Sequence, residues 1–168
     1  MAERSDSRVR LAIVSDSHGH VELTRPAVRM LESLEVDRVL HCGDIGSAEI
    51  VGLFAPWPTD FVFGNCDYDH ASLTKAIDEA GQTCHGKFGE FEIEGKRIAL
   101  LHSDDQRKFR ETTHSGTWDL VCYGHTHVAE VHWQGPTLVV NPGAIYRANP
   151  HSIAIVEIPD MQATIIEL

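Results

Sequence analysis

The chain has 168 residues, and its 42% hydrophobic residues are enough to build the core of one domain over residues 1–168. No apolar stretch approaches the roughly 18 residues of a membrane span, and the first residues lack a secretory signal, so we expect a cytoplasmic protein without a membrane partner. The formal net charge of −11 argues against duplex nucleic acid as a partner, because such binding depends on lysine and arginine.

The first half of the chain alternates buried β-rich runs with helical patterns. Strands are predicted at residues 9–15, 38–42 and 60–65, and helices at residues 22–34 and 69–81.

The second half is richer in hairpins. Strand patterns cover residues 88–102 with a turn at 94–96, then residues 118–124, 129–141 and 151–168. An α/β opening followed by hairpins predicts two packed sheets flanked by helices, and not a simple doubly wound sheet. The four cysteines form no C-x-x-C pair, so neither structural zinc nor a disulfide framework is expected.

Five apolar runs each end in side chains that commonly bind metal ions. These side chains are Asp16 and His18, Asp44, Asn65, His102, and His125 with His127, in chain order. Sites in α/β proteins form beyond the carboxyl ends of the strands, so we expect all seven to meet at one edge.

Each of these residues also has a purely structural explanation when it is taken alone. An aspartate after a strand is usually a turn residue or a helix cap, and a Gly-Asp or Gly-Asn pair is usually a turn. A single buried histidine such as His102 is more often a satisfied polar residue than a ligand. It is the convergence of the set that predicts a site.

This set of ligands suits two metal ions better than one. Two carboxylates, one amide and four imidazoles exceed the four ligands of tetrahedral zinc, and an aspartate can bridge two ions. A hydroxide between the ions would attack the phosphorus of an anionic ester. The nitrogen-rich shell favours manganese, iron, nickel, cobalt or zinc over magnesium. Because imidazoles bind when neutral, activity is expected to fall as the pH drops through about 6.5.

The segments "DSHGH", "CGDIGS", "FGNCD", "LLHSDD", "YGHTH" and "NPGA" occur in this order and resemble the calcineurin-like metallophosphoesterases, in particular the small prokaryotic phosphodiesterases. The resemblance extends from Val9 to about Ile158. It implies a four-layer αββα sandwich of two mixed β-sheets flanked by helices. It also implies that the "NPGA" segment is a turn beside the site, and a purely structural role is the expected one.

The same resemblance assigns the ligands to two ions. It implies that Asp16, His18 and His127 hold the first ion, that Asn65, His102 and His125 hold the second, and that Asp44 bridges them. We expect Asp44 and Asn65 to be catalytic residues as well as metal ligands. His20 is expected to be catalytic but not a ligand, because it is close enough to His18 to face a substrate.

The chain departs from the family pattern at three positions. Cys66 stands where many phosphatases of the superfamily carry a histidine that protonates the leaving group. We therefore expect either a substrate whose leaving group departs easily, or a different acid, namely His20 or a metal-bound water. Ser103 replaces a frequent glycine, which puts the backbone there in question, and Ala129 replaces a frequent proline.

The expected function is hydrolysis of phosphodiester bonds in a small phosphate ester, with nucleotides among the candidates and manganese as the first candidate metal. Two alternatives stay open. One is a phosphomonoesterase, and the other is a protein-interaction scaffold, the role of the retromer subunit that resembles this fold. The natural substrate and the oligomeric state are not predicted.

Overall fold

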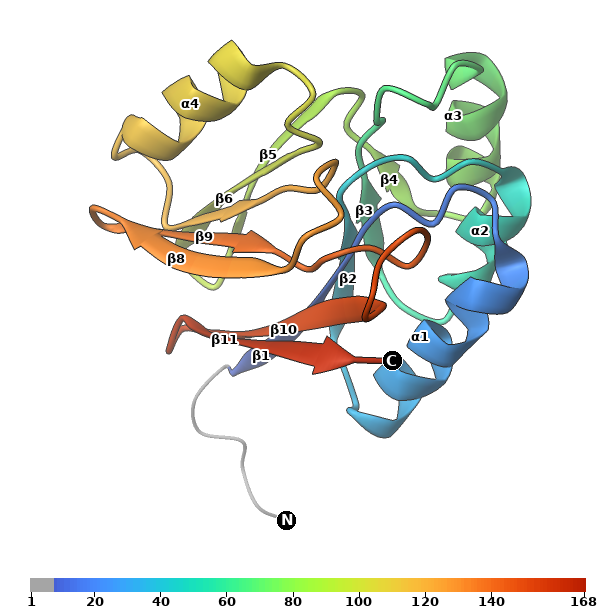
Figure 1. The fold of residues 1–168 in the computed structure, drawn as a ribbon, viewed down its shortest axis with the longest axis horizontal. Helices are drawn as coiled ribbons and strands as arrows, with labels where there is room; N and C mark the ends of the chain where they lie inside the picture. Colours follow the sequence, from blue (N-terminus) through green and yellow to red (C-terminus); the bar gives the residue numbers. More distant parts are fainter. Residues whose placement is uncertain (1–7) are drawn as a thin grey trace.

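The computed structural model of the protein describes residues 8–168, which form two β-sheets and four helices (Figure 1). The six-stranded sheet contains the first four strands of the chain and the last two. Its strands in spatial order are β11 (Gln162–Glu167), β10 (Ser152–Ile158), β1 (Val9–Val14), β2 (Arg38–His41), β3 (Thr59–Phe61) and β4 (Thr83–Cys84). The β1–β4 strands run parallel, while β10 pairs antiparallel with both of its neighbours.

The five-stranded sheet is formed by the middle of the chain. Its strands in spatial order are β5 (Phe88–Ile93), β6 (Lys96–Leu101), β7 (Leu120–Cys122), β9 (Thr137–Asn141) and β8 (Glu130–Gln134). The three central strands are parallel and both edge strands are antiparallel to their neighbours, so this sheet is also mixed.

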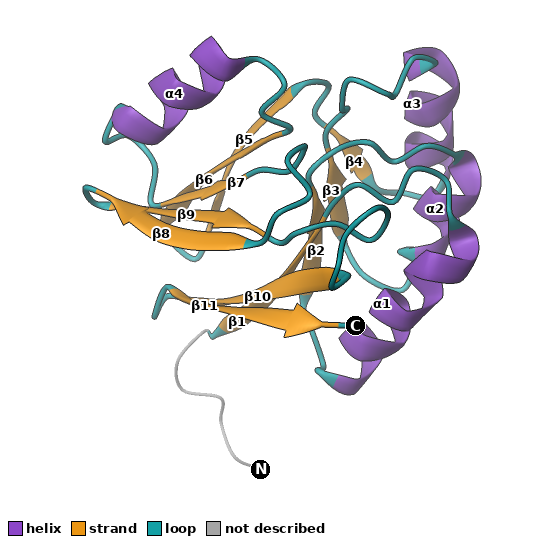
Figure 2. Ribbon diagram, viewed as in Figure 1, coloured by secondary structure: helices purple, strands orange, loops and turns teal. Residues whose placement is uncertain are grey.

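The helices cover the outer faces of the two sheets (Figure 2). The helices are α1 (Val21–Ser33), α2 (Ala48–Leu53), α3 (His70–Glu79) and α4 (Gln106–His114). The first three lie together on the six-stranded sheet, and α4 lies alone on the five-stranded sheet (Figure 1). Within residues 8–168, every helix is too short or too polar to pass through a lipid bilayer.

Three apolar clusters separate these layers, and strand β1 shows how one run of sequence serves two of them. Ala12 and Val14 belong to the cluster beneath α1–α3, whereas Leu11 and Ile13 belong to the cluster between the sheets. A third cluster joins the five-stranded sheet to α4 through Phe109. Alternation of side chains on a strand that is buried on both faces explains why β1 reads as a continuous apolar run. The predicted fold of two mixed sheets flanked by helices in four layers is confirmed.

Two local predictions differ from the structure. The third strand was expected over residues 60–65, but it spans only Thr59–Phe61. Single hydrogen bonds continue beyond its end, from the Val62 N–H to the His41 carbonyl (3.2 Å) and from the Phe63 N–H to the Gly86 carbonyl (2.7 Å). The short helix α2 was not predicted, since its six residues are fewer than two helical turns and are too short a stretch to show a helical period.

Candidate metal centre

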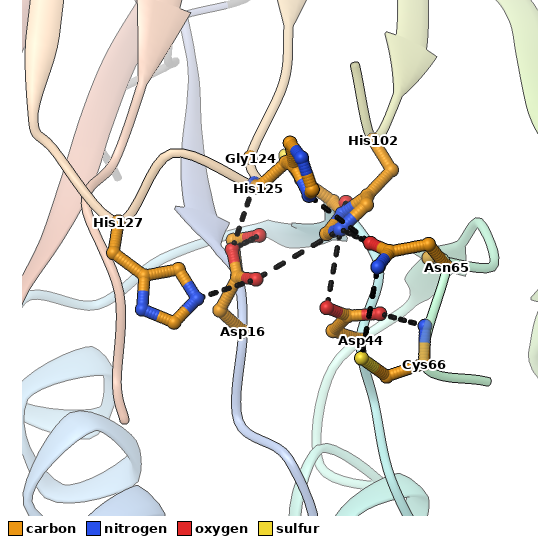
Figure 3. Close-up of polar contacts among 12 residues, drawn as sticks. Asp16, Asp44, Asn65, Cys66, His102, Gly124, His125 and His127 are labelled. Atoms are coloured by element: carbon orange, nitrogen blue, oxygen red, sulfur yellow. Dashed lines mark hydrogen bonds and ion pairs between the residues drawn. The ribbon is translucent and has the colours of Figure 1, made fainter. Parts of the chain in front are cut away.

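The seven predicted ligand side chains meet beyond the carboxyl ends of strands from both sheets. Figure 3 labels six of them, all except His18. All seven lie on the loops that follow β1, β2, β3, β6 and β7. The predicted convergence is therefore present, and the role of these side chains as metal ligands stays a prediction.

Asp16 is the centre of one group of side chains. Its Oδ1 lies 3.2 Å from His127 Nε2 and 3.5 Å from His18 Nε2. The Oδ2 atom accepts two hydrogen bonds, from Ser15 Oγ (2.6 Å) and from the His125 N–H (3.1 Å). Oδ1 is thus the oxygen that is free to bind a cation.

Asp44 lies between this group and a second one. Its Oδ2 is 3.4 Å from His18 Nε2 and 3.2 Å from His102 Nε2, while its Oδ1 accepts the Cys66 N–H at 2.8 Å. In the second group, Asn65 Oδ1 lies 3.0 Å from both His102 Nε2 and His125 Nδ1. A single oxygen atom of Asp44 therefore faces an imidazole of each group.

The chemistry of the donors fits divalent cations. Asp16 Oδ1 and His18 Nε2 are buried, yet neither has a hydrogen-bond partner among residues 8–168. Buried polar atoms without a partner are costly, and a bound ion removes that cost. Asp16, His18 and His127 offer atoms that all lie within 4.8 Å of one another, as do Asp16, Asp44 and His102.

Hydrogen bonds from the far side of the rings orient two of the histidines. His102 Nδ1 donates to the Cys42 carbonyl at 2.8 Å, and His127 Nδ1 donates to the Arg147 carbonyl at 3.1 Å. With Nδ1 as the donor, the lone pair of Nε2 faces the centre, which is the arrangement that metal-binding histidines need.

The backbone of the centre is in an uncommon conformation. Positive φ values occur at five of the seven predicted ligands, namely Asp16 (56°), His18 (46°), Asp44 (52°), His125 (76°) and His127 (61°). Non-glycine residues rarely adopt this region, and they concentrate at functional sites, where the surrounding structure holds them. These turns bring ligands that are only two residues apart, such as His125 and His127, to one place.

Two glycines are required by close contacts at the centre. A Cβ at Gly64 would lie 2.1 Å from Asp44 Oδ1, and one at Gly124 would lie 2.0 Å from Ser15 Oγ. Ser103, whose departure from the family glycine raised doubt, adopts a φ of 79°, and its hydroxyl donates to the Gly124 carbonyl at 3.0 Å. The serine thus keeps the conformation that glycine favours and adds a hydrogen bond to the 124–127 loop.

The carboxylates of the centre stay ionised at neutral pH. Burial raises the pKa of Asp44, but its hydrogen bond to His102 and the charge of that imidazole outweigh burial and lower the pKa to about 2. At Asp16, burial again acts upward, and His18 and His102 bring the pKa below its usual value. The pairing with Asp16 raises the pKa of His18. At His102, burial lowers the pKa, but Asp44 and Asp16 outweigh it and raise the pKa overall.

Sequence reasoning missed the buried carboxylate of Asp67. Its Oδ2 accepts the N–H groups of Ile45 (3.1 Å) and Gly64 (2.9 Å), and its Oδ1 accepts that of Gly46 (3.0 Å). Asp67 therefore ties the loop that carries Asp44 to the loop that carries Asn65. The only available signal was its place two residues after Asn65 in the segment "FGNCD".

A buried histidine braces the first two loops of the site. Burial lowers the pKa of His41 to about 4, so this ring is neutral. His41 Nδ1 accepts the Gly43 N–H (3.2 Å), its Nε2 donates to Ser17 Oγ (2.9 Å), and that hydroxyl donates to the Ile45 carbonyl (3.0 Å). His41 is fully buried at the end of β2, and its contacts extend to the loops of the site.

The "NPGA" segment forms a turn next to the 125–127 loop. Asn141 Oδ1 accepts the Gly143 N–H (3.0 Å), and Asn141 Nδ2 donates to Thr126 Oγ1 (2.9 Å). Thr126 lies between two predicted ligands, so the turn supports the loop from behind, in keeping with a structural role.

Two further residues lie at the rim. His20 is exposed, and its ring stacks on Tyr146, a residue that sequence reasoning did not single out, with the ring centroids 3.9 Å apart. Beside Asp44, burial and the charge of that carboxylate raise the pKa of the Cys66 thiol. Cys66 therefore carries its proton at neutral pH and can serve as a donor.

The chain matches the calcineurin-like phosphoesterase superfamily domain over residues 9–161. It is 28% identical over 138 residues to phosphodiesterase MJ0936 of Methanocaldococcus jannaschii, and the alignment covers 80% of this chain and 83% of that protein. The solved structure of a novel archaeal phosphodiesterase superposes with a TM-score of 0.88 at 26% identity, covering 95% of this chain and 100% of that one.

Vacuolar protein sorting 29 from Cryptosporidium parvum superposes with a TM-score of 0.67 at 17% identity, covering 97% of this chain and 98% of that one, and this likeness shows the fold alone. The family match, in contrast, spans every loop that contributes a side chain to the centre. The chain belongs to the calcineurin-like phosphoesterase superfamily.

Proposed function

We propose that this protein is a metal-dependent phosphodiesterase with a dinuclear centre. Asp16, His18 and His127 would hold one divalent ion, and Asn65, His102 and His125 the other. The observation that carries the proposal is the position of Asp44 Oδ2, which faces both His18 (3.4 Å) and His102 (3.2 Å). A carboxylate oxygen that lies between two groups of ligands is in the position from which one aspartate would bind both metal ions.

Two bound divalent ions supply positive charge for the phosphoryl oxygens and lower the pKa of water in the site. The chain supplies the orientation. Ser15 and the His125 N–H fix Asp16, the Cys66 N–H fixes Asp44, and Asp67 holds the loops of Asp44 and Asn65 together. The protonated thiol of Cys66, beside Asp44, is the side chain at hand to give a proton to the leaving group.

A diester substrate is favoured over a monoester by two arguments. The relative from M. jannaschii bears the name of a phosphodiesterase, and Cys66 occupies the place of the histidine that many phosphatases of the superfamily use as an acid. A scaffold would be free to lose ligands, and this chain keeps all seven side chains in one cluster. We therefore propose an enzyme, and manganese as the first metal to test.

The test is turnover of bis(p-nitrophenyl) phosphate after EDTA treatment and readdition of manganese, nickel, cobalt, iron or zinc. We expect no turnover without metal and recovery with at least one ion, with a higher kcat/KM than for p-nitrophenyl phosphate. A higher kcat/KM for the monoester would make the protein a phosphomonoesterase. Tight binding of two ions without turnover of either ester would favour the scaffold.

The stabilisation of the fold by metal is expected to grow with pH. Because His18 and His102 have raised pKa values, they hold protons in the metal-free protein at pH values above the ordinary 6.5. Their contribution to the stability of that form is complete below the unfolded pKa and is lost as the pH rises through the folded pKa. A metal ion needs the same nitrogens unprotonated, so proton competition starts above the pH of about 6.5 expected from free histidine.

The measurement is the difference in Tm between manganese-loaded and EDTA-treated protein at pH 6, 7 and 8. We expect this difference to increase at each step. A difference that stays constant over this range would show that these two imidazoles do not release protons when metal binds.

A further inference from the structure

We propose that His20, supported by Tyr146, is a stacking platform for an aromatic or heterocyclic ring on the ester group that remains attached to phosphorus. The inference rests on the proposed phosphodiesterase function and names the substrate class that the site would accept. It assigns His20 a binding role in place of the proton donor that the sequence suggested.

The position of His20 has no local structural explanation. His20 is the N-cap residue of α1, a position where serine, threonine, aspartate and asparagine are preferred because their side chains accept backbone N–H groups. The imidazole makes no such capping bond. A ring therefore occupies a place where a smaller polar side chain would stabilise the helix.

The ring of His20 is instead held by Tyr146. The two rings are 3.9 Å apart at an interplanar angle of 15°, which is close to parallel stacking. Tyr146 in turn has the Arg147 guanidinium 5.2 Å from its ring centroid. His20, Tyr146 and Arg147 thus form a preordered stack, and His20 is exposed.

This stack is joined to the candidate metal centre. The Tyr146 N–H donates to the Asp16 carbonyl at 3.0 Å, and the Arg147 carbonyl accepts from His127 Nδ1 at 3.1 Å. The Tyr146 ring also lies 5.5 Å from the ring of His18. Each of the three residues that would hold the first ion therefore touches Tyr146 or Arg147, which places the platform beside that ion.

The placement indicates which part of a diester reaches the platform. Cys66, at the position from which the superfamily protonates leaving groups, contacts Asp44 and Asn65, and its Sγ lies within 4.8 Å of a His18 nitrogen. The end with Asp16 and His127, which Tyr146 and Arg147 contact, is left for the group that stays on phosphorus. A planar ring on that group would lie against the exposed His20 ring. Arg147 has no carboxylate partner among residues 8–168, so its charge is available to strengthen the stack through the Tyr146 ring.

The test compares two diesters with the same p-nitrophenolate leaving group. Bis(p-nitrophenyl) phosphate retains an aryl group, whereas methyl p-nitrophenyl phosphate retains a methyl group. We expect His20→Ala to raise the KM for the aryl diester about tenfold and that for the methyl diester less than about twofold. His20→Phe keeps a stacking ring without a titratable group, so we expect it to retain the low KM for the aryl diester.

Two more variants complete the design. Tyr146→Ala removes the support of the His20 ring and should raise the KM for the aryl diester selectively. The control is His114→Ala, which removes an exposed histidine from α4, on the outer face of the five-stranded sheet, and should leave both KM values unchanged.

Binding gives a readout that does not depend on turnover. Calorimetry with phenyl phosphate and methyl phosphate should show tighter binding of the phenyl compound to wild-type and His20→Phe protein, and no preference in His20→Ala. This preference can be measured even if no metal supports hydrolysis, so failure of the platform and failure of the proposed function are distinguishable.

Three results would overturn the proposal. Equal KM increases for both diesters in His20→Ala would place His20 against the part that the two substrates share. A fall in kcat in both His20 variants, without a selective change in KM, would make His20 a proton donor. Unchanged kinetics together with an unchanged preference for phenyl phosphate would leave His20 as an ordinary surface residue.

Discussion

Replacement of Asp44 by alanine is expected to lower kcat/KM for bis(p-nitrophenyl) phosphate by on the order of 1,000-fold or more and to reduce the number of tightly bound divalent ions from two to at most one. Asp44 Oδ2 is the oxygen that faces both His18 and His102, so its removal weakens both proposed ion sites at once. The measurements are steady-state kinetics and metal content after gel filtration.

The matched control is Asp119→Ala. Asp119, at the amino end of β7, accepts the Arg97 N–H at 2.8 Å, much as Asp44 accepts the Cys66 N–H at 2.8 Å. Both variants lose one carboxylate and one such hydrogen bond, but only Asp44 lies between the ligand groups. Two tightly held ions in Asp44→Ala protein would refute the bridging assignment. Equal loss of activity in both variants would indicate a general effect on folding.

The sequence was sufficient to predict the layers and the convergence of the ligand side chains. Most of β1 is apolar because Leu11 faces one core and Ala12 another, and such a run is typical of a strand that is buried on both faces. The parallel strands then end at one edge, which is why Asp16 and Asp44 meet although their strands are separated by helix α1.

The geometry within the site could not be predicted in the same way. The left-handed backbone at His18 and His125 is uncommon for any non-glycine residue, and it is held by hydrogen bonds between loops that are far apart in the chain. The His18 N–H, for example, donates to the Asp44 carbonyl at 2.9 Å. The His20–Tyr146 stack likewise joins residues that share no sequence motif.

Asp67 shows most clearly what a motif leaves out. It lies in the quoted segment "FGNCD", yet its spacing alone suggested neither a ligand nor a catalytic group. Its function depends on three N–H groups, those of Ile45, Gly46 and Gly64, which reach it only in the folded protein. A carboxylate that binds backbone rather than metal cannot be distinguished from a turn residue by sequence pattern.

Asp67→Ala is accordingly expected to lower the free energy of unfolding of the metal-free protein by roughly 3 to 5 kcal/mol and to weaken metal binding about 10- to 100-fold. Asp67 is 3% exposed, so loss of its carboxylate leaves three N–H groups in the interior without an acceptor. Because these groups flank Asp44 and Asn65, the loops of both residues are expected to shift. The measurements are urea unfolding in EDTA and calorimetric titration with manganese.

Asp69→Ala is the matched control, two residues further along the chain. Asp69 is exposed, and its carboxylate caps α3 by accepting the Ser72 N–H at 3.1 Å, so its loss is expected to cost about 1 kcal/mol and to leave metal affinity unchanged. A destabilisation of Asp67→Ala no larger than that of Asp69→Ala, with wild-type manganese affinity, would mean that the two loops keep their places without this carboxylate. The candidate centre would then depend on the ligands' own contacts and on the Ser17–His41 hydrogen bond (2.9 Å) for its geometry.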